Sequence, residues 1–164
     1  AYTGGATLAA AAAGATVTHV DASKGMVTWA KENAVSSGLK DAPIRWLVDD
    51  CVKFVEREIR RGNTYDAIIM DPPSYGRGPK GEIWKIEDMI HPLIRLCTKI
   101  LSKDALFFLV NSYTTGLAPA VLTYMISTEL KSWNGHVDSQ EIGLPVTNSG
   151  LVLPCGASGR WESR

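Results

Sequence analysis

Acidic residues stand at the ends of three short apolar runs in the chain. Asp21 closes TVTHVD, Asp49 and Asp50 close IRWLVDD, and Asp71 closes YDAIIMD. Runs of this kind are typical of strands buried on both faces, which places the acids at strand ends. A carboxylate there can bind the hydroxyl or amino groups of a ligand. A solvated strand end or a helix cap would also explain any one of these acids taken singly.

Two of these acids suit the groups of a nucleoside. Asp21 follows a glycine pair by about sixteen residues, at a position where a carboxylate can accept both hydroxyls of a ribose. Asp50 could accept a hydrogen bond from the exocyclic amine of an adenine, and the backbone N–H of Cys51 could donate to a ring nitrogen. Gly4 and Gly5, which directly precede a helical segment, would let the backbone approach the same ligand closely.

The acid that closes the third run, Asp71, begins the sequence Asp71-Pro72-Pro73-Ser74-Tyr75. Two consecutive prolines fix φ, remove two N–H donors and stiffen the turn. The carboxylate and the neighbouring carbonyls are therefore held as acceptors in one geometry, which suits a planar substrate that carries N–H groups. Tyr75 could stack on such a ring or pack against its own loop.

The elements that position these residues alternate between strand and helix patterns. The pattern predicts a Gly-rich, charged, solvated loop after Pro73, where Arg77, Lys80 and Lys85 are interleaved with acids. Strands are predicted at 16–21, 44–50, 65–71 and 105–110 and, as an antiparallel pair, around 140–144 and 150–154; helices are predicted at 6–13, 23–37, 52–61, 86–101 and 119–130. This order predicts the doubly wound α/β class, a mostly parallel Rossmann-like sheet with an antiparallel C-terminal strand pair.

A nicotinamide-dependent dehydrogenase would also use a glycine turn and a ribose-binding acid. The G-x-G-x-x-G motif of that class is absent here. His19 falls inside a predicted strand and is expected to be a core residue. Trp84 has no spacing that predicts a binding cage.

The motifs resemble those of class I S-adenosylmethionine (SAM) dependent methyltransferases. More narrowly, YTGG and DPPSY resemble the first and fourth motifs of bacterial large-subunit ribosomal RNA methyltransferases, and the resemblance runs from Tyr2 to the closing LPCGASGRW. It implies that Thr3, Gly4 and Gly5 border the methionine part of SAM. The resemblance also implies cofactor contacts from Asp21 at the ribose, from Ser23 and Met26 at the adenine face, and from Asp50 and Cys51 at the adenine edge. Tyr2 and Asp71 complete the implied cofactor-binding residues. The implied catalytic residues are Asp71, Pro72, Pro73 and Tyr75.

The cysteines bear on the atom that would be methylated. Methylation of carbon 5 of cytosine needs a cysteine thiolate that adds to the ring. The turn directly after Asp71 contains none of Cys51, Cys97 and Cys155, and the predicted fifth strand ends in Asn111-Ser112-Tyr113. Transfer to a base nitrogen needs only orientation and an acceptor for its proton, so the sequence favours nitrogen.

Charge and length bear on the partner. Seventeen basic and seventeen acidic residues give a net charge of zero, so little bulk attraction for RNA is expected. The 164 residues predict a single methyltransferase domain that lacks most of its first strand. We expect an N-terminal segment, absent here, to bind the ribosomal RNA. Three widely spaced cysteines without a CxxC pair predict a cytoplasmic protein with no metal site, and no membrane segment is predicted.

The sequence is therefore compatible with three functions: a SAM-dependent RNA methyltransferase, a methyltransferase-like module that binds SAM or RNA without catalysis, and an NAD-binding dehydrogenase. The motifs favour the first. Methyl transfer from labelled SAM separates it from the second, and thermal shift with SAM against NAD separates it from the third.

Overall fold

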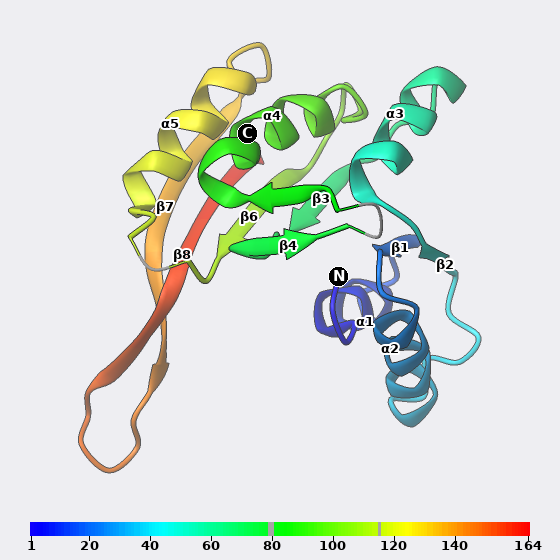
Figure 1. Ribbon diagram of the computed structural model, residues 1–164, viewed down its shortest axis with the longest axis horizontal. Helices are drawn as coiled ribbons and strands as arrows, with labels where there is room; N and C mark the ends of the chain where they lie inside the picture. The colour runs from blue at the N-terminus through cyan, green and yellow to red at the C-terminus, as the bar shows by residue number, and fades with distance from the viewer. Residues whose placement is uncertain (79–80, 115) are drawn as a thin grey trace. The chain divides into compact units, whose positions relative to one another are not determined.

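Two units, Ala1–Arg61 and Gly62–Arg164, make up the chain. The computed structural model describes residues 1–78, 81–114 and 116–164 and is drawn in Figure 1. Each unit contains a pair of parallel strands. Together with the alternation of strands and helices and an antiparallel C-terminal pair, this pairing confirms the predicted α/β fold class.

The first unit is a two-stranded parallel sheet with three helices. Small side chains let the helices lie close to β1, because Ala11 of α1 and Ala30 and Ala34 of α2 are all buried. The side-chain oxygen of Ser23 caps α2 by accepting the N–H of Met26 at 3.4 Å. The elements are α1 (Gly5–Ala12), β1 (Val17–Asp21), α2 (Lys24–Ser36), β2 (Ile44–Val48) and α3 (Cys51–Arg61).

His19 is a core residue of this unit, as its position in a strand predicts. Its side chain is 1% exposed, and its ring centroid lies 4.9 Å from that of Trp46 on β2. The ring Nδ1 is 2.9 Å from the hydroxyl oxygen of Thr7, while Nε2 is buried without a hydrogen-bond partner. Burial lowers the pKa of His19 to about 4, against the opposing effect of Asp21.

The lowered pKa predicts that the first unit loses stability in mild acid. Between pH 6.5 and about 4 the unfolded chain takes up a proton at His19 that the folded chain does not, so the free energy of unfolding falls as the pH falls. The loss should reach about 2 kcal/mol at pH 5. Urea unfolding followed by tryptophan fluorescence at pH 7 and pH 5 measures it.

A matched pair of variants isolates this effect. His19→Asn should remove most of the difference between the two pH values, whereas His136→Asn, at an exposed position on another strand, should leave it. A wild-type protein and a His19→Asn variant that lose equal stability between pH 7 and pH 5 would contradict the assignment.

The second unit is built on a four-stranded sheet in the order β3-β6-β8-β7. Strands β3 and β6 are parallel, while β8 is antiparallel to both β6 and β7. Helix α5 packs against β7 and β8, and Figure 1 shows the β7–β8 hairpin extending beyond this helix. The elements are β3 (Ala67–Met70), β4 (Tyr75–Arg77), β5 (Ile83–Lys85), α4 (Ile86–Thr98), β6 (Phe107–Ser112), α5 (Pro119–Glu129), β7 (Gly135–Pro145) and β8 (Val152–Ser163).

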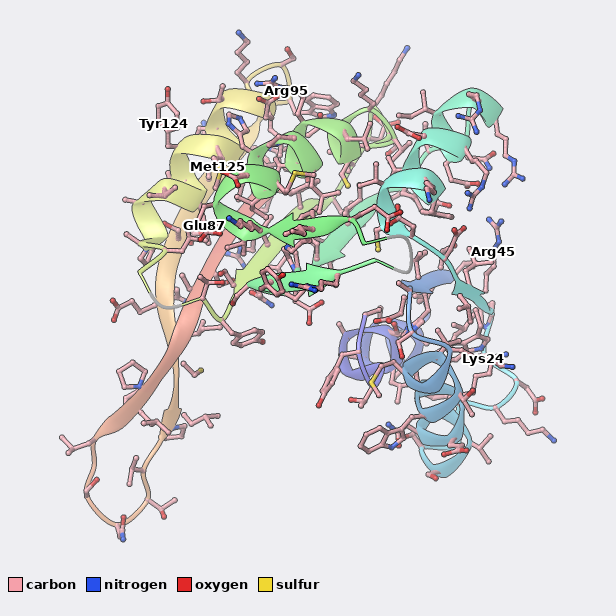
Figure 2. The ribbon with its side chains drawn as sticks, viewed as in Figure 1. Lys24, Arg45, Glu87, Arg95, Tyr124 and Met125 are labelled. Atoms are coloured by element: carbon pink, nitrogen blue, oxygen red, sulfur yellow. The ribbon has the colours of Figure 1, made fainter. Side chains whose placement is uncertain are left out.

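Helices α4 and α5 are linked through Glu129, by an ion pair from Arg95 and a hydrogen-bond contact with His91. Arg95 and His91 of α4 both reach its carboxylate, at 3.1 and 2.8 Å. In Figure 2, Met125 and Tyr124 project in different directions from α5, and accordingly Met125 is buried while Tyr124 is 70% exposed. The buried side of α5 covers the antiparallel part of the sheet.

The C-terminal strand pair is longer than predicted. Its antiparallel pairing is confirmed, but the strands span 135–145 and 152–163 rather than about 140–144 and 150–154. Gly159 lies within β8, beyond the predicted end of that strand, at a place of close packing. At Gly159 a β-carbon would lie 2.7 Å from Cβ of Leu122 on α5, so the missing side chain lets the helix approach the sheet.

The segment after Pro73 is not a continuous loop. Residues 75–77 and 83–85 form the antiparallel hairpin β4–β5, in which Gly76 pairs with Trp84. Tyr75, Ile83 and Trp84 favour strands, and their pairing outweighs the glycines around them. Lys80, which the sequence places in this segment, lies outside the described residues.

Candidate functional site

The turn before α1 is held close to α2. Gly4 is buried and has φ of 88°, and a β-carbon on it would lie 3.0 Å from Cβ of Ala30. The side-chain amide of Asn33 donates to the carbonyl of Thr3 at 2.9 Å. Helix α1 begins at Gly5, so the N–H groups of its first turn directly follow this bend.

Asp21 binds the same turn through its carboxylate. One oxygen accepts the N–H of Tyr2 at 2.9 Å and is 2.7 Å from the main-chain nitrogen of Ala1. The other oxygen accepts the N–H of Ser23 at 2.8 Å. Burial alone would raise the pKa of Asp21, but the hydrogen bonds from Ala1, Ser23 and Tyr2 outweigh it and lower that pKa.

An ionised Asp21 fits the ribose of a nucleoside cofactor. A carboxylate offers about four lone-pair positions, and three backbone nitrogens approach this one, at its two oxygens. The side chain is partly exposed, so its remaining accepting capacity is open to a hydroxyl group. Ser23 and Met26 follow it at the beginning of α2, as the sequence predicts.

Asp50 and Cys51 follow the neighbouring strand. The N–H of Asp49 donates to the main-chain carbonyl of Asp21 at 3.0 Å, which brings the carboxyl ends of β1 and β2 together. The carboxylate of Asp50 caps α3 by accepting the N–H of Lys53 at 2.9 Å, and Cys51 is the first residue of that helix. Asp49 is bound to Arg57. The helix-cap alternative therefore describes Asp50, whose side chain is nonetheless exposed.

In the second unit, Asp71 follows β3 directly and is exposed. Met70 pairs with Val110, so the carboxyl ends of β3 and β6 are neighbours. The hydroxyl of Ser74 lies 2.7 Å from that of Thr114, which joins the Asp-Pro-Pro turn to the segment after β6. The carboxylate thus stands on a turn anchored at the edge where ligands of α/β sheets bind.

Tyr75 and Arg77 lie on one face of β4. The side chain of Tyr75 is 51% exposed, which agrees with an accessible ring rather than a packed one. Its hydroxyl oxygen accepts the Nε–H of Arg77 at 2.9 Å. The pair presents an aromatic ring and a guanidinium group side by side.

Two contacts of the site could not be read from the sequence. Trp84 donates its indole N–H to the carbonyl of Pro73 at 2.6 Å, and Asn33 donates to Thr3 from thirty positions along the chain. The first depends on the register of a hairpin made of three-residue strands, and the second on the orientation of α2. Neither residue lies in a motif.

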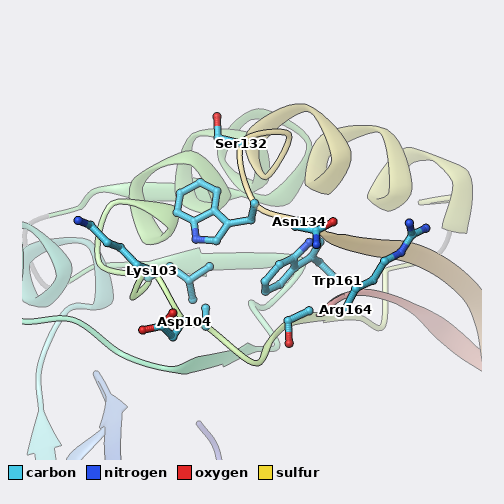
Figure 3. Close-up of a pocket in the computed structure, with 10 residues that line it drawn as sticks. Lys103, Asp104, Ser132, Asn134, Trp161 and Arg164 are labelled. Carbon is cyan, nitrogen blue, oxygen red and sulfur yellow. The ribbon is translucent and has the colours of Figure 1, made fainter.

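A cavity of about 620 Å³ also lies in the second unit, near the amino end of β6 (Figure 3). Ligands of doubly wound sheets bind beyond the opposite, carboxyl ends of the strands. The cavity is therefore separate from the Asp71 turn. Its lining residues are Leu101, Lys103, Asp104, Ala105, Ser132, Trp133, Asn134, Trp161, Ser163 and Arg164.

Within residues 1–78, 81–114 and 116–164, no group of three or more His, Cys, Asp or Glu side chains is placed to hold a metal ion. In the same part of the chain, no helix is long and apolar enough to cross a membrane.

The chain is similar in sequence to ribosomal RNA methyltransferases, although it matches no family model. It is 30% identical to ribosomal RNA large subunit methyltransferase K of Neisseria meningitidis serogroup B over 113 residues, which are 68% of the chain and 32% of that protein. It is 37% identical to ribosomal RNA large subunit methyltransferase K/L of Pseudoalteromonas atlantica over 103 residues, which are 62% of the chain and 14% of that protein. The chain thus corresponds to a minor part of each relative.

The structure is similar to that of the SAM dependent methyltransferase from Agrobacterium tumefaciens. The two share 42% sequence identity and a TM-score of 0.94, over 99% of this chain and 54% of the other. The chain therefore spans about half the length of this solved structure. These similarities confirm the resemblance carried by YTGG and DPPSY: the chain is related to the class I SAM-dependent methyltransferases, has their Rossmann-like α/β fold, and counts large-subunit ribosomal RNA methyltransferases among its relatives.

Proposed function

We propose that this chain binds SAM and transfers its methyl group to a nitrogen of a base in structured RNA, with ribosomal RNA as the substrate to test first. The observation that carries the proposal is the exposed Asp71 carboxylate on an anchored Asp-Pro-Pro turn at the carboxyl end of β3. The similarity to ribosomal RNA large subunit methyltransferases supports RNA as the acceptor.

The first unit supplies the residues proposed to hold the cofactor. The ionised Asp21 would accept a hydrogen bond from a ribose hydroxyl at its remaining lone-pair position, and the backbone from Tyr2 to Gly5 would border the methionine part. Asp50 and Cys51 would face the adenine edge, and Ser23 and Met26 its face. Bound SAM would supply an electrophilic methyl group on its sulfonium.

The second unit supplies the residues proposed to hold the methyl acceptor. The carboxylate of Asp71 and the carbonyl of Pro72 would accept hydrogen bonds from the N–H groups of the base, and the carboxylate would take the proton that nitrogen methylation releases. The Pro73 carbonyl is already bound by Trp84, so its part is to shape the turn. Tyr75 would stack on the extruded base, with the Arg77 guanidinium beside it for a phosphate.

The positions of the three cysteines favour nitrogen over carbon 5 of cytosine. Cys51 begins α3 in the first unit, Cys97 is buried in α4, and the thiol of Cys155 lies 3.4 Å from the carbonyl of Ile142 in the β7–β8 ribbon. None lies in the turn directly after Asp71, and the last residue of β6 is Ser112. Catalysis would then consist chiefly of positioning, which holds the nitrogen lone pair against the methyl group.

Transfer of tritium from methyl-labelled SAM to total RNA tests the function. The RNA should come from cells that lack the gene, so that the target nucleotide is unmodified. We expect label in ribosomal RNA, and nucleoside mass spectrometry should identify an N-methylated base. Appearance of 5-methylcytosine would overturn the nitrogen assignment, and thermal stabilisation by NAD in place of SAM would overturn the function itself.

A further inference from the structure

Trp84 contacts the turn that carries Asp71. It lies on β5, ten or more residues along the chain from that turn, and its indole N–H donates to the carbonyl of Pro73 at 2.6 Å. The side chain is only partly exposed. No motif includes this residue.

The chemistry of the turn explains why an external donor matters. Pro72 and Pro73 have no N–H groups, so the turn cannot use these positions to donate hydrogen bonds of its own. The carbonyl oxygens of the turn can still accept hydrogen bonds from neighbouring residues, and the Trp84 indole N–H donates to that of Pro73. The orientation of this carbonyl fixes the peptide plane after Pro73.

The hairpin is shaped so that the indole can reach the turn. Trp84 pairs with Gly76 across the strands, and a β-carbon on Gly76 would lie 3.7 Å from Cβ of Trp84 and 4.0 Å from Cγ of Pro73. Pro73, Gly76 and Trp84 are therefore packed together. A second bond, from the N–H of Ile86 to the carbonyl of Ser74 at 3.1 Å, ties the end of β5 to the next residue of the turn.

We propose that Trp84 is a positioning residue for methyl transfer: its indole N–H holds the Asp71-Pro72-Pro73 turn in the orientation in which Asp71 and Pro72 meet the base. The inference rests on the proposed function. Trp84 acts through the turn and does not contact the substrate. Its loss should therefore lower kcat and leave the affinity for SAM unchanged, because small misplacements of reacting groups reduce rates strongly.

The test compares Trp84→Phe with Trp29→Phe. Phenylalanine keeps an aromatic ring at position 84 and removes the N–H donor, while Trp29 is a half-exposed tryptophan on α2. We expect kcat of Trp84→Phe to fall about tenfold with an unchanged Kd for SAM, while Tm falls only by the small amount that loss of one hydrogen bond causes. Trp29→Phe should keep the wild-type kcat.

Exchange of the indole N–H, followed by ¹⁵N NMR, provides a readout that does not depend on activity. The Trp84 N–H should exchange with deuterium more slowly than that of Trp29. Equal exchange rates, or a wild-type kcat in Trp84→Phe, would overturn the positioning role. Absence of methyl transfer by the wild-type chain would instead overturn the proposed function, while the exchange rates still decide whether the bond exists.

Discussion

Replacement of Asp71 by alanine is expected to lower the rate of methyl transfer by about a hundredfold or more, the magnitude associated with loss of an acid or base group. The carboxylate is exposed at the end of β3, on a turn held by Trp84 and Thr114 from both sides. Removing it takes away the proposed acceptor for the base N–H and leaves these anchors in place. The affinity for SAM should change little, because the proposed ribose and adenine contacts belong to the first unit.

Single-turnover transfer from labelled SAM, together with calorimetric titration of SAM, measures both quantities. Asp71→Asn keeps one carbonyl acceptor and should retain more activity than the alanine variant. Asp104→Ala, at another exposed aspartate of the second unit that lines the cavity near the amino end of β6, should behave as wild type. If Asp71→Ala turns over at the wild-type rate, the assignment of Asp71 fails.

The strand ends that carry the proposed site were predictable because their chemistry is local. A short β-branched run followed by an acid fixes both a buried strand and the polar group at its end, and Asp21 and Asp71 lie where this pattern puts them. The cap of α2 is local in the same way, because a serine before a helix favours capping, and Ser23 caps α2. The residue types at these positions determine their own local structure.

Features that depend on register or close approach were not predictable. The last strand was predicted to end near residue 154, yet Gly156 and Gly159 lie inside β8, where a side chain would meet Ser112 of β6 or Leu122 of α5. The β4–β5 hairpin was missed because each strand has only three residues, too few to show alternation. Trp84 acquires its role only once that hairpin sets its position opposite Gly76.

Gly4 combines a special backbone conformation with close approach to a neighbouring helix, so its replacement is expected to have a second large effect. We expect Gly4→Ala to lower the affinity for SAM about tenfold or more, because the turn from Tyr2 to Gly5 must move. Two causes act together. The left-handed backbone at φ of 88° costs about 1–2 kcal/mol for any residue with a β-carbon, and that carbon would lie 3.0 Å from Cβ of Ala30. Because Ala30 is fully buried on α2, the backbone of the turn has to yield.

Gly14→Ala separates the two causes. Gly14 has nearly the same backbone, with φ of 91°, but a β-carbon there meets nothing within 4 Å. It should therefore lose about 1–2 kcal/mol of stability through strain alone and bind SAM as tightly as the wild type. Chemical unfolding and calorimetric titration of both variants give the comparison. Equal SAM affinities in Gly4→Ala and Gly14→Ala would mean that the turn before α1 does not border the cofactor. Loss confined to Gly4→Ala would place the cofactor beside Gly4, whose missing side chain lets the turn pack against Ala30 of α2.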